Sequence, residues 1–152
     1  KGRKDLVTLK RVAISNFLLV FLISSLFCLF FIVSHDLLPW LYLDSNSSAI
    51  SSDVITVVKI ASDLILIAAF FQIADGLQAV VLGALRGIQD VITPAILIFL
   101  SYGAIGFPIS YYFGLKTDWS TSGIWLGLLT GLTLSALLLL LRFQYLSQKL
   151  DS

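Results

Sequence analysis

The stretch FLLVFLISSLFCLFFIV, residues 17–33, decides the fold class of this chain. It contains no charged residue, and its side chains do not alternate between apolar and polar as they do in a strand of a membrane barrel. With its flanks, over residues 12–34, it is long enough to cross a hydrocarbon core of about 30 Å as a helix. We therefore predict an integral membrane protein built from helices.

The rest of the 152-residue chain has the same character. It is 58% hydrophobic and only 12% charged, against about 25% charged residues in soluble domains. Its apolar runs predict four transmembrane helices, over residues 12–34, 54–86, 94–113 and 122–143. Short turns and one longer, serine-rich connection join them, so we expect a single all-α bundle without a soluble domain.

The charges predict an orientation. Most basic residues flank the predicted helices on one side: Lys1, Arg3, Lys4, Lys10, Arg11, Arg86, Arg142 and Lys149. The connections on the other side are mainly acidic, and the three tryptophans lie near them. By the positive-inside rule and the aromatic belt, both ends should face the cytoplasm. Residues 1–11 are then a basic cytoplasmic lead-in, and residues 144–152 a cytoplasmic tail.

Two helix starts carry capping signals. Asp53 is a plausible N-cap of the second helix, because its carboxylate can accept hydrogen bonds from free amide groups. Thr93 and Pro94 predict the N-cap and the first residue of the third helix. The chain also contains no methionine, so we expect it to be a fragment.

One acidic residue lies deep in the second helix, in AAFFQIADGLQAVVLGALRG (residues 68–87). Asp75 is the twelfth residue of the apolar segment 64–85, near the bilayer midplane. A charge there costs about 2.5–3.5 kcal/mol on insertion scales. Gln72 lies on the same helix face, and Gln78 lies at its edge.

Such a carboxyl group can have a coupling function or a structural one. Burial disfavours the charged form, so the group tends to hold a proton or to bind a cation. The amide groups of Gln72 and Gln78 could complete part of the coordination shell of such a cation or hydrogen-bond the protonated acid. The structural alternative is that Asp75 joins helices through hydrogen bonds.

The third and fourth helices add further candidates. In SYGAIGFPISYY (residues 101–112), Pro108 should leave the Ala104 carbonyl unpaired and bend the helix, either as a hinge or as a fixed bend for packing. Tyr102 could reach a cavity or bond a neighbouring helix. Small residues recur every four positions in the fourth helix, at Gly123, Gly127, Gly131 and Ser135. This stripe predicts close packing inside the bundle or, alternatively, homodimerisation.

Several functions are excluded by what the chain lacks. One histidine and one cysteine cannot form a metal site of the usual type. No glycine-rich phosphate loop follows a strand, and no second buried aspartate is available for intramembrane catalysis. We therefore expect no enzyme, no cofactor and no nucleic-acid partner.

Two longer stretches carry a family resemblance: FQIADGLQAVVLGALRGIQDVITPAILIFLSYGAIGFPISYY (residues 71–112) and GIWLGLLTGLTLSALLLLLRF (residues 123–143). They resemble the end of transporters of the multidrug and toxic compound extrusion (MATE) family. The resemblance implies twelve helices in two six-helix lobes, of which residues 1–152 form the last four. It also implies exchange of Na⁺ or H⁺ for amphipathic, often cationic, drugs or toxic metabolites by alternating access.

The resemblance extends to the site. In the NorM-type branch an acidic residue on the tenth helix contributes to a cation site, and Asp75 occupies the matching position. Phe71 stands where some members have tyrosine, and Gln72, Gln78 and Tyr102 are further candidates for lining the cavity. The implied partners are the lipid of a bacterial inner membrane and upstream helices of the same polypeptide. Two alternatives stay open: a flippase of lipid-linked precursors with a related fold, and a small structural or assembly subunit.

Overall fold

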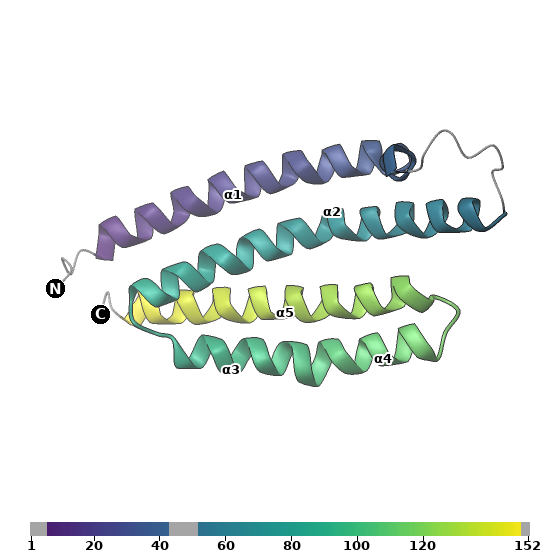
Figure 1. Cartoon of the computed structure of the whole chain (residues 1–152). Coiled ribbons are helices and arrows are strands. Elements are labelled where there is room, and N and C mark those ends of the chain that lie inside the picture. Colours follow the sequence, from purple (N-terminus) through teal and green to yellow (C-terminus); the bar gives the residue numbers. More distant parts are fainter. Residues whose placement is uncertain (1–5, 43–51, 150–152) are drawn as a thin grey trace.

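The computed structural model describes residues 6–42 and 52–149, and these residues form helices joined by turns (Figure 1). The elements are α1 (Leu6–Ser34), the 3₁₀ helix η1 (Leu38–Tyr42), α2 (Ser52–Gly87), α3 (Ile92–Leu100), the π-helical η2 (Ser101–Gly106), α4 (Phe107–Leu115) and α5 (Ser120–Lys149). Because α3, η2 and α4 are continuous, they make one span. Within the described ranges, four helices are long and apolar enough to cross a membrane, which confirms the predicted all-α membrane fold.

The helices extend beyond the apolar runs that predicted them. α1 begins at Leu6, inside the basic lead-in, and α5 continues to Lys149, inside the predicted tail. Hydropathy marks the part of a helix that lies in lipid. The flanking lysine, arginine, glutamine and leucine residues are good helix formers and carry the helix further.

Both predicted N-caps are wrong. α2 already includes Ser52, so Asp53 lies in its first turn, where a carboxylate still stabilises the helix dipole. α3 begins at Ile92 with Val91 as its N-cap and has no side-chain capping bond. Pro94 is tolerated in this first turn because the first four amide groups of a helix have no intrahelical partner.

The spans lie side by side in the order α1, α2, α5 and α3–η2–α4 (Figure 1). At one end α1 and α3 begin and α2 and α5 end (Figure 1). We name it the basic end after its charged residues, Arg11, Arg86, Arg142 and Lys149. The opposite end is named the acidic end after Asp36, Asp53, Asp63 and Asp118.

The apolar core lies at the basic end. Val81, Leu85 and Leu139 are fully buried there, between α2 and α5. The Phe17 ring of α1 packs against Phe143 of α5, with 6.5 Å between ring centroids. The same cluster includes further side chains from all four spans: Ala13, Leu82, Ala84, Ile88, Leu97, Ile98, Leu140 and Leu146. The four spans therefore share one apolar cluster at this end.

The glycine stripe of α5 lies against α4 and η2. A Cβ at Gly123 would collide with the Phe113 carbonyl group, and one at Gly127 would collide with the Ser110 backbone. The Ser110 hydroxyl donates a hydrogen bond to the Ile124 carbonyl oxygen across this interface, at 2.9 Å. The stripe thus brings the two backbones together within the chain, and α4 and η2 cover it.

Candidate functional site

Asp75 is exposed on α2, between two helix interfaces. The next residue, Gly76, faces α1 so closely that a Cβ there would lie 2.7 Å from Val20 and 2.8 Å from the Ser24 hydroxyl. The preceding residue, Ala74, is buried on the side of α5. Since successive helix residues are 100° apart, Asp75 projects between these neighbours. It lies about 18 Å along the helix from Gly87, which is near half the thickness of a membrane.

The opposite face of α2 is apolar, as its sequence pattern indicates. Phe70, Ile73 and Leu77 line a groove of about 390 Å³ together with side chains of α5. Bulky apolar residues therefore occupy one side of α2, and the carboxylate occupies the other.

Tyr102 of η2 is brought toward Asp75. The tyrosine is half-buried, and the charge of Asp75 acts on its hydroxyl group. These residues belong to spans separated by α5, so they approach each other across one face of the chain. A carboxylate and a hydroxyl can together bind a proton or provide oxygen ligands for a small cation.

Gln72 and Gln78 are both half-buried on α2. The Oε1 atom of Gln78 is buried and accepts no hydrogen bond from the part of the chain that the structure describes. Leaving such an acceptor unpaired costs about 1–3 kcal/mol. Gln78 follows Asp75 by three residues, about one helical turn, and its unpaired oxygen can accept a hydrogen bond from a water or a protonated carboxyl group, or bind a cation.

Phe71 lies at the α2–α5 interface. Its ring meets that of Trp125 edge to face, with 5.7 Å between centroids and an interplanar angle of 76°. Such pairs contribute about 0.5–1.5 kcal/mol beyond area burial. The side chain thus helps to fix α5 beside the Asp75 face.

The third span departs from α-helical geometry before Pro108. In η2 the helix is widened, and the Phe107 amide donates to the carbonyl of Tyr102, five residues earlier. Proline lacks an amide hydrogen and crowds the preceding turn, so a wide turn accommodates it. Gly106, at the end of η2, approaches α5 closely, since a Cβ there would lie 3.2 Å from the Gly131 Cα. The unpaired Ala104 carbonyl and the hinge stay predictions.

The acidic end contains two polar cavities of about 440 and 370 Å³, both lined by Lys59 and Asp63. Asp118 lines the larger cavity, and His35 and Asp36 line the smaller one. The charged residues of α2 at this end can therefore stay hydrated.

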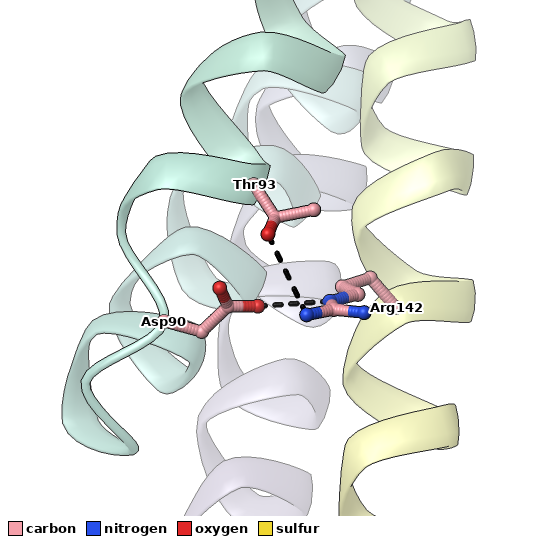
Figure 2. A network of polar contacts seen from close by, with 3 residues as sticks. All are labelled: Asp90, Thr93 and Arg142. Atoms are coloured by element: carbon pink, nitrogen blue, oxygen red, sulfur yellow. Dashed lines mark hydrogen bonds and ion pairs between the residues drawn. The ribbon is translucent and has the colours of Figure 1, made fainter.

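Sequence reasoning missed an ion pair at the basic end. The Nε of Arg142 donates to Oδ2 of Asp90 at 2.9 Å, and its Nη2 donates to the Thr93 hydroxyl at 3.5 Å (Figure 2). The charge pattern of the sequence identifies Arg142 only as an orienting charge and assigns Asp90 no role. A usable signal was present: an arginine at the end of the last apolar run and an aspartate in a short turn at the membrane boundary favour partners of opposite charge.

The chain is similar in sequence to known membrane proteins. The MatE family model matches residues 1–112. A probable multidrug resistance protein NorM from Rhizobium meliloti is 37% identical over 155 aligned residues, covering 99% of this chain and 32% of the relative. Its counterpart from Xylella fastidiosa is 35% identical over 149 residues, covering 98% and 30%.

A third NorM relative, from Bacillus thuringiensis, is 35% identical over 119 residues, covering 78% of this chain and 26% of the relative. The chain thus spans about 30% of the length of the curated relatives that it matches. Since the family model covers most of the chain, and the four spans and the NorM relatives agree with it, the chain belongs to the MatE family.

Proposed function

We propose that this chain forms part of a cation-coupled antiporter that exports amphipathic, mainly cationic, drugs or toxic metabolites across a bacterial inner membrane. Asp75 binds the coupling cation or proton. The observation that carries the proposal is an exposed carboxylate midway along a membrane helix, with Gln78, whose buried amide oxygen is unpaired within the described residues, three residues further along the same helix. The chain belongs to a transporter family and is not an enzyme.

The chemistry of Asp75 supports coupling. When the site is empty, its charge favours a conformation in which water or a polar cavity reaches it. When a proton or cation neutralises the charge, apolar surfaces can close over the site at lower cost. Loading therefore shifts the equilibrium between two access states, and a drug that binds the other state drives the opposite shift.

The partners of Asp75 are Tyr102 and Gln78 within this chain and helices of the remaining polypeptide. The relatives extend well beyond the matched segment, and the family resemblance implies that upstream helices complete the second lobe. Oxygen ligands of this kind suit Na⁺, and the same carboxyl suits a proton.

The test of antiport uses the full-length protein in proteoliposomes loaded with a fluorescent cationic drug. We expect uphill drug movement when a sodium gradient alone or a proton gradient alone is imposed, and the effective gradient identifies the coupling ion. If neither gradient drives movement against the drug gradient, the antiport proposal is wrong.

The alternatives make different predictions. A flippase of lipid-linked precursors would leave drug tolerance unaltered on deletion and disturb envelope synthesis. An assembly subunit that dimerises through the glycine stripe would need this stripe at the surface. α4 and η2 cover the stripe, which weighs against that alternative.

The proposed orientation predicts the labelling of single cysteines. Arg86→Cys and Asp118→Cys each place a thiol at an exposed position, at the basic and the acidic end respectively. In whole cells producing the full-length protein, an impermeant maleimide should label Asp118→Cys and should label Arg86→Cys only after lysis. The reverse pattern would place the basic end outside.

A further inference from the structure

The ion pair between Asp90 and Arg142 joins positions 52 residues apart. Its side chains are largely removed from solvent, at 15% exposed for Asp90 and 30% for Arg142. We propose that Arg142 is a positioning residue that holds the α2–α3 turn against α5 throughout the transport cycle. The basic end then moves as one body while the Asp75 face rearranges. This inference rests on the proposed transport function.

The turn presents Asp90 in a fixed position. Gln89 adopts a left-handed conformation with φ of 65°, and its amide donates to the Arg86 carbonyl at 2.9 Å. The Asp90 amide donates to the Leu85 carbonyl at 3.0 Å. The backbone of Asp90 is therefore fixed in the turn by bonds that do not involve Arg142.

Arg142 contacts both sides of the start of α3. Nε bonds Asp90 in the turn, whereas Nη2 bonds Thr93 in the first helical turn (Figure 2). A planar guanidinium group can point separate donors at two acceptors, but a lysine ammonium acts as a single compact charge. The two directed hydrogen bonds thus fix the position of α5 relative to α3, which an undirected charge–charge attraction would not do.

The surroundings indicate a permanent brace and not a gate that opens. Leu85 lies five residues before Asp90, and Leu139 lies three residues before Arg142. Both leucines are fully buried. Separating the pair would strand a partly desolvated charge in an apolar setting, which is strongly unfavourable. It would also pull apart the apolar cluster to which all four spans contribute.

Cross-linking distinguishes a brace from a gate. In full-length protein with its other cysteines replaced, Asp90→Cys and Arg142→Cys are joined by a bis-methanethiosulfonate about as long as an arginine side chain, which forms a reducible disulfide with each thiol and releases two sulfinate groups. Before cross-linking, the double cysteine variant should show drug efflux at least fivefold below that of the unmodified protein. Cross-linking should restore most of the lost efflux. A further fall in efflux that a reductant reverses would overturn the proposal, as would failure to cross-link.

Substitutions separate positioning from general stability. Arg142→Gln should lower the maximal efflux rate severalfold per molecule in the membrane, while the half-saturating cation concentration stays within twofold because Asp75 is distant. Arg142→Lys should recover part of the maximal efflux rate. The double variant that exchanges the charges, Asp90→Arg with Arg142→Asp, should transport faster than Asp90→Arg alone or Arg142→Asp alone. The matched control is Arg86→Gln, at an exposed arginine of the same end.

The proposal fails if Arg142→Gln transports as well as Arg86→Gln. It also fails if the exchanged pair is no better than the single variants. If Arg142→Gln does not reach the membrane, Arg142→Lys, which keeps the charge, takes its place, and transport equal to that of Arg86→Gln again overturns the proposal.

Discussion

Cation-driven drug efflux should fall at least tenfold when Asp75→Asn is introduced into the full-length protein. Asparagine has nearly the same shape, but it cannot take up a proton or balance a cation at this site. Removing a charge from the membrane interior also lowers the insertion cost, so the variant should accumulate normally. The measurement is the efflux rate of a fluorescent cationic drug, normalised to the amount of protein in the membrane.

A second aspartate on α2 supplies the control. Asp63 is exposed and lines the polar cavities of the acidic end, so Asp63→Asn should transport at nearly the normal rate. Asp75→Glu keeps the charge with a longer side chain and should retain part of the activity. Efflux by Asp75→Asn within twofold of the unmodified protein would remove Asp75 from the mechanism.

Gly127→Leu is expected to prevent stable folding. A Cβ at this position would already overlap the backbone nitrogen and the hydroxyl of Ser110. Ser110 is buried and bonded to the Ile124 carbonyl, so it cannot move without separating α4 from α5. Overpacking typically costs about 1–3 kcal/mol, and a backbone collision belongs at or above the top of that range. Size-exclusion chromatography and thermal melting in detergent measure the loss.

The matched substitution is Gly83→Leu. Gly83 lies on α2, and within the described residues no side chain or neighbouring helix comes within 4 Å of a Cβ built there, so the larger side chain meets open space beside these spans. This variant should elute and melt like the unmodified protein. If both variants lose folded protein to the same extent, or if Gly127→Leu melts at the normal temperature, the described close contact between α4 and α5 is incorrect.

The sequence predicted the membrane spans because hydrocarbon imposes a length and an apolar composition on any helix that crosses it. It predicted the end of α1 at Ser34 but neither the start of α1 nor the end of α5. Leu6 and Lys149 lie in charged flanks, where hydropathy carries no information about helical hydrogen bonds. The predicted N-cap at Thr93 was wrong because of a long-range contact. Its hydroxyl accepts a hydrogen bond from the distant Arg142 and does not cap its own helix.

Long-range contacts were beyond the sequence pattern. Pro108 indicated an irregular third span, but the position of η2 depends on how Gly106 packs against Gly131 of α5. The contact between Phe71 and Trp125 depends on the register of α2 against α5, which a helical wheel of one span does not contain.

The candidate site was only partly visible in the sequence. Asp75 stood out because a carboxylate in lipid is costly whatever surrounds it. Its approach to Tyr102 and the unpaired oxygen of Gln78 required the packed spans. The brace of Asp90 and Arg142 required them as well, since no local rule joins positions so far apart.

Drug binding to purified full-length protein, measured against the concentration of the coupling cation or against pH, tests the central claim most directly. If Asp75 couples the two ligands, the drug Kd of the unmodified protein should rise at least fivefold as the site fills, since linkage is reciprocal. In Asp75→Asn the drug should still bind, with a Kd that no longer responds to the ion. An unchanged ion dependence in Asp75→Asn would contradict the claim.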